Sequence, residues 1–397
     1  MKVEPEENQR LVEELSLFTT FAELRRSDAY RSRAAELHRL LDEPRTYEFS
    51  SPQPRLHAFL RVVEWNIQRG THVEAIIDVL NTHPILRFAD LLLLNELDDG
   101  MLRSGNRNVP RELSQGIGAH AIYGVEYLEM TKGIGDELKL EGRNTAALHG
   151  NAILTRHSFS NPRTVRLPRC EKNYESPEKR VGGRVGLLVE VEIRGSTLSS
   201  LLAVTAHLDV VNTPSCRDRQ MRALLDHIDL QESRGSNQGI VIGADLNSHT
   251  FARGGWLRSS RSAIRILTTR QERLAHELLH PETREPAIGQ LKKHGYEVAA
   301  LNDRRATSRA IVSTGSDANW VPGPLRRWVL RRIDPSALLL EFRLDWLASR
   351  GLKALGASEK VDHETGVRSI APQTCPGLIH EGAPISDHDP IVADLAL

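Results

Sequence analysis

The sequence predicts a four-layer α/β sandwich, in which two mixed β-sheets pack face to face and helices flank them on the outside. Two observations lead to this fold class. Apolar, β-prone runs alternate with amphipathic helical stretches from about residue 58 to the C-terminus. Carboxylates, amides and two histidines stand where several of these runs begin or end. We therefore expect polar side chains to be gathered at the strand ends.

We expect residues 1–55 to form a helical N-terminal leader. Apolar residues recur at three- and four-residue steps among charges between Asn8 and Asp42, a pattern typical of amphipathic helices. Pro44, Pro52 and Pro54 end this segment before the first strand. The leader either caps the body of the fold or serves an interface.

We expect residues 56–397 to form the catalytic domain. A strand at Phe59–Trp65 precedes an amphipathic helix at Val73–Leu80, and a second helix is expected at Cys216–Leu230. The run Ala89–Leu94 is apolar throughout, which predicts a strand buried on both faces. Further strands are expected at Ala121–Glu126, Asn151–Thr155, Val185–Ile193, Leu198–Thr205, Gly239–Ile242 and Ile391–Leu395.

Three stretches interrupt this alternation. Asp98–Gly105 and Lys132–Gly150 are expected to be inserted loops. A longer insertion at about residues 250–340 is expected to be helical and loop-like. Basic residues outnumber acidic ones between Arg253 and Arg350, with arginine pairs at 304–305, 326–327 and 331–332. These arginines form either a solvated face or a rim that steers phosphates.

Composition restricts the compartment and the partners. Lys+Arg and Asp+Glu number 52 each, so the net charge favours neither nucleic acid nor a membrane surface. The N-terminus lacks the apolar core of a signal peptide, and no stretch has the roughly 18 apolar residues of a membrane span. The cysteines Cys170, Cys216 and Cys375 offer neither a disulfide framework nor a zinc pattern, which favours a reducing compartment. We expect a cytoplasmic protein with no membrane span and no obligate protein partner.

The polar clusters carry the chemistry of phosphoester hydrolysis. That reaction needs the phosphate charge neutralised, a water made nucleophilic and the leaving oxygen stabilised. Each cluster alone has an ordinary structural explanation, such as a strand cap, a loop acid or a core histidine. In chain order the clusters are Glu64-Trp65-Asn66-Ile67-Gln68, Leu94-Asn95-Glu96-Leu97-Asp98, Ala206-His207-Leu208-Asp209, Gly243-Ala244-Asp245-Leu246-Asn247, Arg343-Leu344-Asp345-Trp346 and Ile385-Ser386-Asp387-His388-Asp389-Pro390.

Taken together, the clusters resemble the endonuclease/exonuclease/phosphatase superfamily, which has the deoxyribonuclease I-like fold. The resemblance covers roughly Arg61 to Leu397, and its strongest elements contain Asp245 with Asn247 and Asp387 with His388. It implies a phosphodiesterase or phosphatase that depends on Mg²⁺ or Mn²⁺. Gln68 stands where abasic-site endonucleases have an aspartate, and the tyrosine segment of those enzymes is not recognisable.

The resemblance implies a metal site made by Asn66, Glu96 and Asp387. Glu96 matches the main metal-binding glutamate of the family, and Asp387 matches a carboxylate near the metal. Asn66 offers its carbonyl oxygen to metal or its amide to phosphate. Carboxylate and amide oxygens are hard ligands that suit magnesium or manganese.

The resemblance also implies the catalytic residues. His388 matches the histidine that activates water or contacts the scissile phosphate, and Asp345 matches its orienting carboxylate. Asp245, which holds the attacking water in relatives, and Asn247, which donates to a phosphate oxygen, are expected to alternate on a strand end and to point the same way. His207 matches the histidine that bonds the phosphate or assists the leaving group.

Arg184 is a weaker candidate for substrate binding, with a surface salt bridge as its alternative role. The leading function is a phosphoester hydrolase, and a nuclease would use Arg184 and the later arginine pairs to follow a nucleic acid backbone. A small-substrate phosphatase would narrow its cleft with the two inserted loops. A lipid headgroup hydrolase ranks third because exposed apolar residues are not apparent. A catalytically silent binding module on the same fold is the rival from another class.

Overall fold

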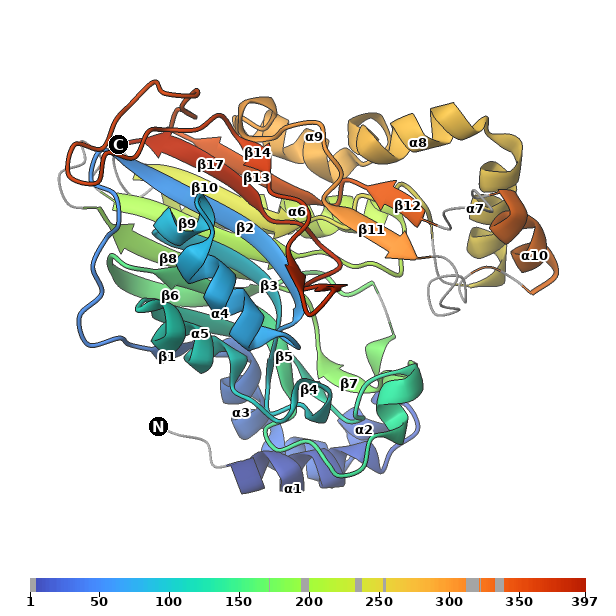
Figure 1. Ribbon diagram of the computed structural model, residues 1–397. Coiled ribbons are helices and arrows are strands. Elements are labelled where there is room, and N and C mark those ends of the chain that lie inside the picture. The colour runs from blue at the N-terminus through green and yellow to red at the C-terminus, as the bar shows by residue number, and fades with distance from the viewer. Residues whose placement is uncertain are drawn as a thin grey trace.

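The computed structural model describes residues 5–170, 172–193, 200–232, 238–252, 255–311, 321, 323–332 and 339–397. It has the four-layer α/β sandwich that the sequence predicts, with two mixed sheets face to face and helices outside (Figure 1).

The first sheet has eight strands in the order β1-β4-β5-β3-β2-β17-β14, with β7 also paired to β4. Strands β2 and β3 run parallel, and β17 pairs antiparallel with β2 in an interior position. The last strand of the chain is therefore part of the core. The strands are β1 Arg45–Tyr47, β2 Phe59–Arg69, β3 Leu91–Asp99, β4 His120–Glu129, β5 Leu148–Thr155, β7 Arg180–Gly182, β14 Gln373–Thr374 and β17 Ile391–Ala396.

The second sheet has five strands in the order β13-β10-β9-β8-β6, in which β9 and β10 run parallel. Its apolar side faces the first sheet, and Leu187, Val189 and Val241 are buried there against Val62 and Leu93. The strands are β6 Ser158–Arg166, β8 Val185–Glu192, β9 Ser200–His207, β10 Gln238–Asp245 and β13 Asp345–Arg350.

Helices form the two outer layers. On the first sheet, α4 (Val73–Thr82) and α5 (Val109–Ile117) bury Ile76 and Leu113. On the second sheet, α6 (Pro214–Glu232) and α9 (Pro286–Lys293) bury side chains such as Leu224 and Ile288. Among the described residues, no helix combines the length and the apolar content needed to cross a bilayer.

The leader packs onto the first sheet. It contains α1 (Pro5–Ser16), α2 (Phe21–Arg26) and α3 (Asp28–Asp42), and their buried leucines join the same core as β2 and β3. The amide of Asn8 donates to the carbonyl of Ala146 over 2.8 Å, and β1 extends the sheet beside β4. The leader therefore packs on the body of the fold.

The insertion divides into two parts. Helix α9 belongs to the outer layer of the second sheet, whereas α7 (Trp256–Thr268), α8 (Gln271–Leu279) and α10 (Gly323–Arg332) form a lobe at one end of the molecule (Figure 1). The lobe has a small core of its own that includes Phe251, Ile266 and Val329. A ribbon of β11 (Ser308–Ile311) and β12 (Leu339–Phe342) joins it to the body. Parts of residues 312–338 lie outside the described residues.

The structure adds short elements that the sequence pattern does not predict. Strands β1, β7, β11 and β12, together with the two-residue strands β14, β15 (Ile379–His380) and β16 (Ala383–Pro384), are too short to show a clear period. The solvent-facing edge strand β6 also lacks an apolar run. The expected strand at residues 89–94 continues instead to Asp99, through the polar cluster at its end. Leu198, where the expected strand before Thr205 begins, lies outside the described residues.

Candidate active site

Strand register brings three of the predicted residues into one row across the second sheet. His207 at the end of β9 pairs with Asp245 at the end of β10, and Asp245 pairs with Asp345 at the start of β13. On the facing sheet, Asn66 of β2 lies opposite Asn95 of β3. The Nδ2 of Asn66 donates to Oδ2 of Asp245 over 3.0 Å, which joins the two sheets at this end.

Irregular backbone surrounds this row. The pairing of β2 with β3 shifts between Asn66 and Arg69, and the pairing of β3 with β5 shifts between Leu94 and Leu97. Glu96 lies inside the second bulge with a φ of 57°, a conformation that is uncommon for residues other than glycine. A bulge re-aims a side chain out of the strand alternation, and such strain concentrates at functional sites.

His388 and Asp345 are hydrogen-bonded, as the sequence predicts. The Nδ1 of His388 lies 2.7 Å from Oδ2 of Asp345, and the two residues are 8% and 0% exposed. Burial disfavours the charged ring, but the charge of Asp345 and its hydrogen bond hold the pKa of His388 well above its usual value. Because Nδ1 faces Asp345, Nε2 is the nitrogen available to a reacting group.

Neighbouring groups fix both members of this pair. The backbone amide of Asp345 donates to Oγ1 of Thr307, and that of His388 donates to Oγ of Ser386. The indole of Trp65 donates to the carbonyl of His388 over 2.9 Å. The pair therefore has little freedom to reorient.

Asp245, Asn247 and His207 form a second hydrogen-bonded group. Strand β10 ends at Asp245, and Asn247 follows in left-handed backbone with a φ of 48°, so the expected strand alternation was wrong. The backbone amide of Asn247 donates to Oδ1 of Asp245 over 2.8 Å. Its Nδ2 lies 2.8 Å from Nε2 of His207.

The two titratable groups of this set have shifted pKa values. Burial and the adjacent charge of Asp345 raise the pKa of Asp245 to about 7. Burial, together with the positive charge of Arg184, holds the pKa of His207 well below its usual value. His207 is therefore neutral near pH 7 and differs in charge from His388.

The three predicted metal ligands become progressively more exposed in the order Asn66, Glu96, Asp387. Partial burial opposes ionisation of Glu96, but the charges of His149 and Arg69 hold its pKa below the usual value. Loss of hydration and the nearby charge of Glu96 raise the pKa of Asp387. Glu96 and Asp387 are therefore close enough to interact electrostatically at the mouth of the site.

The residues present fit a divalent cation. Atoms of Asp245, Asp345 and His388 lie within 4.8 Å of one another, and Asp245 accepts a hydrogen bond from the predicted ligand Asn66. Among the described residues, Oδ1 of Asp345 and both carboxylate oxygens of the buried Glu64 have no hydrogen-bond partner. A group of carboxylates this dense favours a bound positive charge, and hard oxygen donors select Mg²⁺ or Mn²⁺ over softer metals.

Arg184 lies behind this site in buried ion pairs. Its Nη1 donates to Oε2 of Glu126 over 2.7 Å, and its Nε lies 3.6 Å from Oδ1 of Asp209. Arg184 is only 6% exposed, so the alternative of a salt bridge at the surface was wrong. Its positive charge acts on the site electrostatically, because it lowers the pKa of His207.

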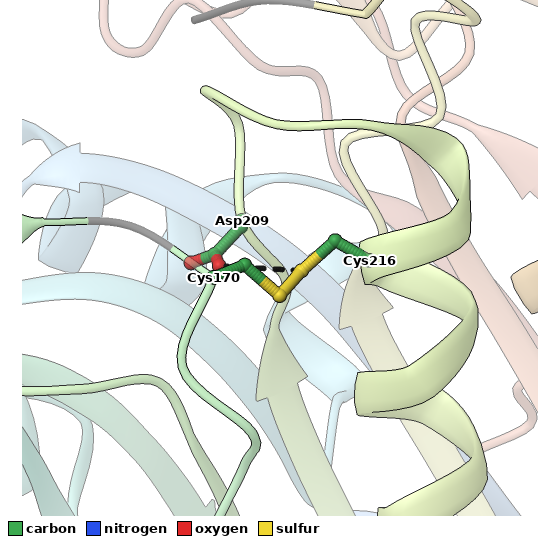
Figure 2. Close-up of side chains that lie close together, drawn as sticks. All are labelled: Cys170, Asp209 and Cys216. Carbon is green, nitrogen blue, oxygen red and sulfur yellow. Dashed lines mark hydrogen bonds between the residues drawn. A yellow bond between two sulfur atoms is a disulfide. The ribbon is translucent and has the colours of Figure 1, made fainter.

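A disulfide between Cys170 and Cys216 borders these ion pairs (Figure 2). It joins the segment after β6 to the first turn of α6, and Oδ2 of Asp209 lies 3.8 Å from the sulfur of Cys216. The expectation of no disulfide was wrong, because 46 residues separate partners that only the fold brings together. Disulfides are typical of oxidising compartments, so the cysteines do not support the expected reducing compartment.

Sequence analysis gave no role to several residues that shape the site. Oδ1 of Asn95 accepts the backbone amide of Asp245, and its Nδ2 donates to Thr205 across the sheets. Ser386 connects His388 to β2, because its hydroxyl also donates to the carbonyl of Asn66. Asn95 and Ser386 each stand next to a predicted metal ligand in the sequence, and this position could have identified them. Thr307 carried none, since it lies 38 residues before Asp345.

A model of the Endonuclease/Exonuclease/phosphatase family matches residues 63–388. No curated protein matches the sequence. Similar solved structures include an endonuclease/exonuclease/phosphatase from Beutenbergia cavernae DSM 12333, at 16% identity over 86% of this chain and 72% of that chain, with a TM-score of 0.48.

Two further solved structures are similar to this chain. The human Nocturnin catalytic domain with bound sulfate anion is 13% identical over 89% of this chain and 97% of that chain, with a TM-score of 0.45. The D. rerio TDP2 complexed with single strand DNA product is 14% identical over 86% of this chain and 100% of that chain, with a TM-score of 0.45.

Proposed function

We propose, from the premise that this chain belongs to the endonuclease/exonuclease/phosphatase family, that it is a divalent-metal-dependent phosphoester hydrolase, a phosphodiesterase or a phosphatase. The observation that carries the proposal is the buried hydrogen bond between Asp345 and His388, in line with Asp245 and His207 at one end of the sandwich. A binding module without catalysis would not need a histidine held in one orientation beside so many carboxylates.

Asn66, Glu96 and Asp387 hold the metal in this proposal. Mg²⁺ or Mn²⁺ held by these residues would supply positive charge to the phosphate oxygens. Asn66 is well placed to align its neighbours, since its amide already bonds Asp245. Glu96 is carried out of the β3 alternation by the bulge, and the lowered pKa keeps its carboxylate ionised.

His388 and Asp345 act as one unit on the attacking water. Asp345 accepts from Nδ1 and fixes the orientation of the ring, so Nε2 faces the water or a phosphate oxygen. Asp245 holds the water. The backbone amide of Asn247 donates to the carboxylate of Asp245 and keeps it in place. The attack forms a bond between the water oxygen and phosphorus and breaks the bond between phosphorus and the ester oxygen, and the water proton passes to the carboxylate of Asp245.

Asn247, His207 and Asn66 contact the phosphate oxygens in this scheme. The neutral state of His207 allows one ring nitrogen to accept from Asn247 while the other carries the proton. Arg184 acts through His207 and does not touch the substrate, because its guanidinium is engaged by Glu126 and Asp209.

A substrate panel tests the proposal. Purified protein with Mg²⁺ or Mn²⁺ is assayed against bis-p-nitrophenyl phosphate, p-nitrophenyl phosphate, plasmid DNA, RNA and inositol phosphates. We expect at least one to be hydrolysed, with turnover lost on chelation and restored by the metal. Hydrolysis of plasmid DNA or RNA alone would identify the nuclease alternative. Failure on every substrate by protein shown to bind the metal would favour the silent binding module.

A further inference from the structure

The lobe presents large apolar side chains to solvent. On α7, Trp256 and Leu257 are each 70% exposed and Ile264 is 51% exposed, and on the neighbouring α10, Trp328 is 61% exposed. Single exposed apolar residues are ordinary, but four on two helices that contact each other exceed such scatter and point to an interaction site. The lipid headgroup hydrolase ranks third on the sequence because such residues are not apparent there, and that premise was wrong.

These residues are not exposed because the lobe lacks a hydrophobic core. The opposite faces of these helices supply Ala263, Ile266 and Val329 to the core of the lobe. Leu257 and Ile264 are seven residues apart, which places them on one face of α7. Helix α7 therefore has one apolar face turned inward and apolar side chains turned outward.

The same surface is cationic. The segments Trp256–Thr268 and Gly323–Arg332 contain no Asp or Glu, and Arg258, Arg261 and Arg327 are exposed on them. The nearby acid Glu277, on α8, forms ion pairs with Arg265, Arg273 and Arg284. These arginines balance its negative charge. The exposed arginines of α7 and α10 are thus available to an external anion.

The lobe is connected to the rim of the active site. In the β11–β12 ribbon, Ser308 forms a β-bridge with His388, and the backbone amide of Arg309 donates to the carbonyl of Asp387 over 3.3 Å. The other strand of the ribbon ends at Phe342, which is in the lobe core and three residues before Asp345. Figure 1 shows α7 and α10 side by side beyond this ribbon.

We propose that α7 and α10 dock the protein on an anionic phospholipid membrane. The two tryptophans, Leu257 and Ile264 enter the boundary between headgroups and acyl chains, and the arginines bind lipid phosphates. Single-stranded nucleic acid also suits arginine and tryptophan, because bases stack on aromatic rings. It makes no use of exposed aliphatic side chains, whereas Leu257 and Ile264 gain free energy from leaving water in a membrane. The aliphatic residues therefore favour the membrane.

Vesicle sedimentation tests this proposal with the full chain, and the result does not depend on the proposed hydrolysis. Vesicles of phosphatidylcholine alone are compared with vesicles that also contain phosphatidylserine. We expect binding to the anionic vesicles that weakens with salt, and a loss of at least about tenfold in affinity for Trp256→Ser/Trp328→Ser. Leu17→Ser, which removes an 81% exposed residue of the leader, is the matched control and should bind normally.

Circular dichroism shows whether the double variant is folded, and Arg258→Gln/Arg327→Gln gives an independent test by removing charge without touching an apolar residue. Absence of binding to anionic vesicles, or equal binding by wild type and both double variants, would overturn the proposal. Binding of a single-stranded oligonucleotide that the tryptophan changes abolish, with no vesicle binding, would assign the surface to nucleic acid instead.

Discussion

The candidate active site and the α7–α10 surface differ in how they place polar and apolar groups. The site buries charge: Asp345 is 0% exposed and His388 is 8% exposed, and each is held by its neighbours. The lobe does the reverse, since it exposes Trp256 and Trp328 and turns arginines to solvent. Buried hydrogen-bonded charge is suited to fixing reacting groups, whereas exposed apolar and cationic groups are suited to binding a surface. Changes in one region should therefore leave the role of the other intact.

The largest effect is expected from removing the last strand. Deleting the residues after Pro390 removes β17 from its interior position and takes away Asp394, which bonds the buried Arg61 over 2.7 Å. An unpaired buried arginine alone costs about 3–5 kcal/mol. We expect the truncated chain to lose its cooperative thermal unfolding, and with it both phosphoester hydrolysis and vesicle binding. An unchanged Tm would show that β17 is peripheral, contrary to the register.

The next effect separates the active site from the lobe. His388→Ala should lower turnover by on the order of a hundredfold or more, and Asp345→Asn by less, because the imidazole remains but loses the negative charge that orients it. The double variant should be little worse than His388→Ala alone, since both changes disable one step. His363→Ala, at an exposed histidine, is the control. If steady-state kinetics showed that the two losses multiply in the double variant, His388 and Asp345 would not act as one unit. Vesicle binding should be unaffected in all of these variants.

Smaller effects are expected at the disulfide. Unfolded, unreduced protein should show one reactive thiol, since two of the three cysteines are joined and Cys375 is free. Cys216→Ser should lower the free energy of unfolding by about 2–4 kcal/mol, measured by denaturant titration under oxidising conditions. Cys375→Ser is the comparison, because it leaves the disulfide intact. Three reactive thiols in the untreated protein would contradict the bond.

The smallest effect on hydrolysis is expected from the lobe. Trp256→Ser/Trp328→Ser should leave the turnover of soluble bis-p-nitrophenyl phosphate within about twofold of wild type, because exposed residues away from the site rarely change its geometry. Kinetics on this soluble substrate provide the measurement. A loss as large as that of His388→Ala would mean that the lobe is part of the catalytic centre and would erase the distinction between the two regions.

The sequence predicted the features that local pattern controls. Apolar runs predicted that His207, Asp245 and Asp345 stand where strands begin or end, and the alternation of strands with helices predicted the sandwich. Features that depend on distant packing were out of reach. The partner of Cys170 and the role of Thr307 follow from the fold alone. Leu257 and Ile264 have the spacing of a buried helical face, and only the packing of the lobe shows that they are exposed.

The proposed metal-dependent hydrolysis is tested most directly by metal titration of Glu96→Gln. This change keeps the shape of the side chain but removes the charge, so it should raise the Mg²⁺ or Mn²⁺ concentration needed for half-maximal hydrolysis by at least about tenfold, with Tm nearly unchanged. Glu364→Gln, an exposed acid near His57 before the start of β2, should titrate as wild type. Identical metal dependence in both variants, or full activity in excess chelator, would contradict the account.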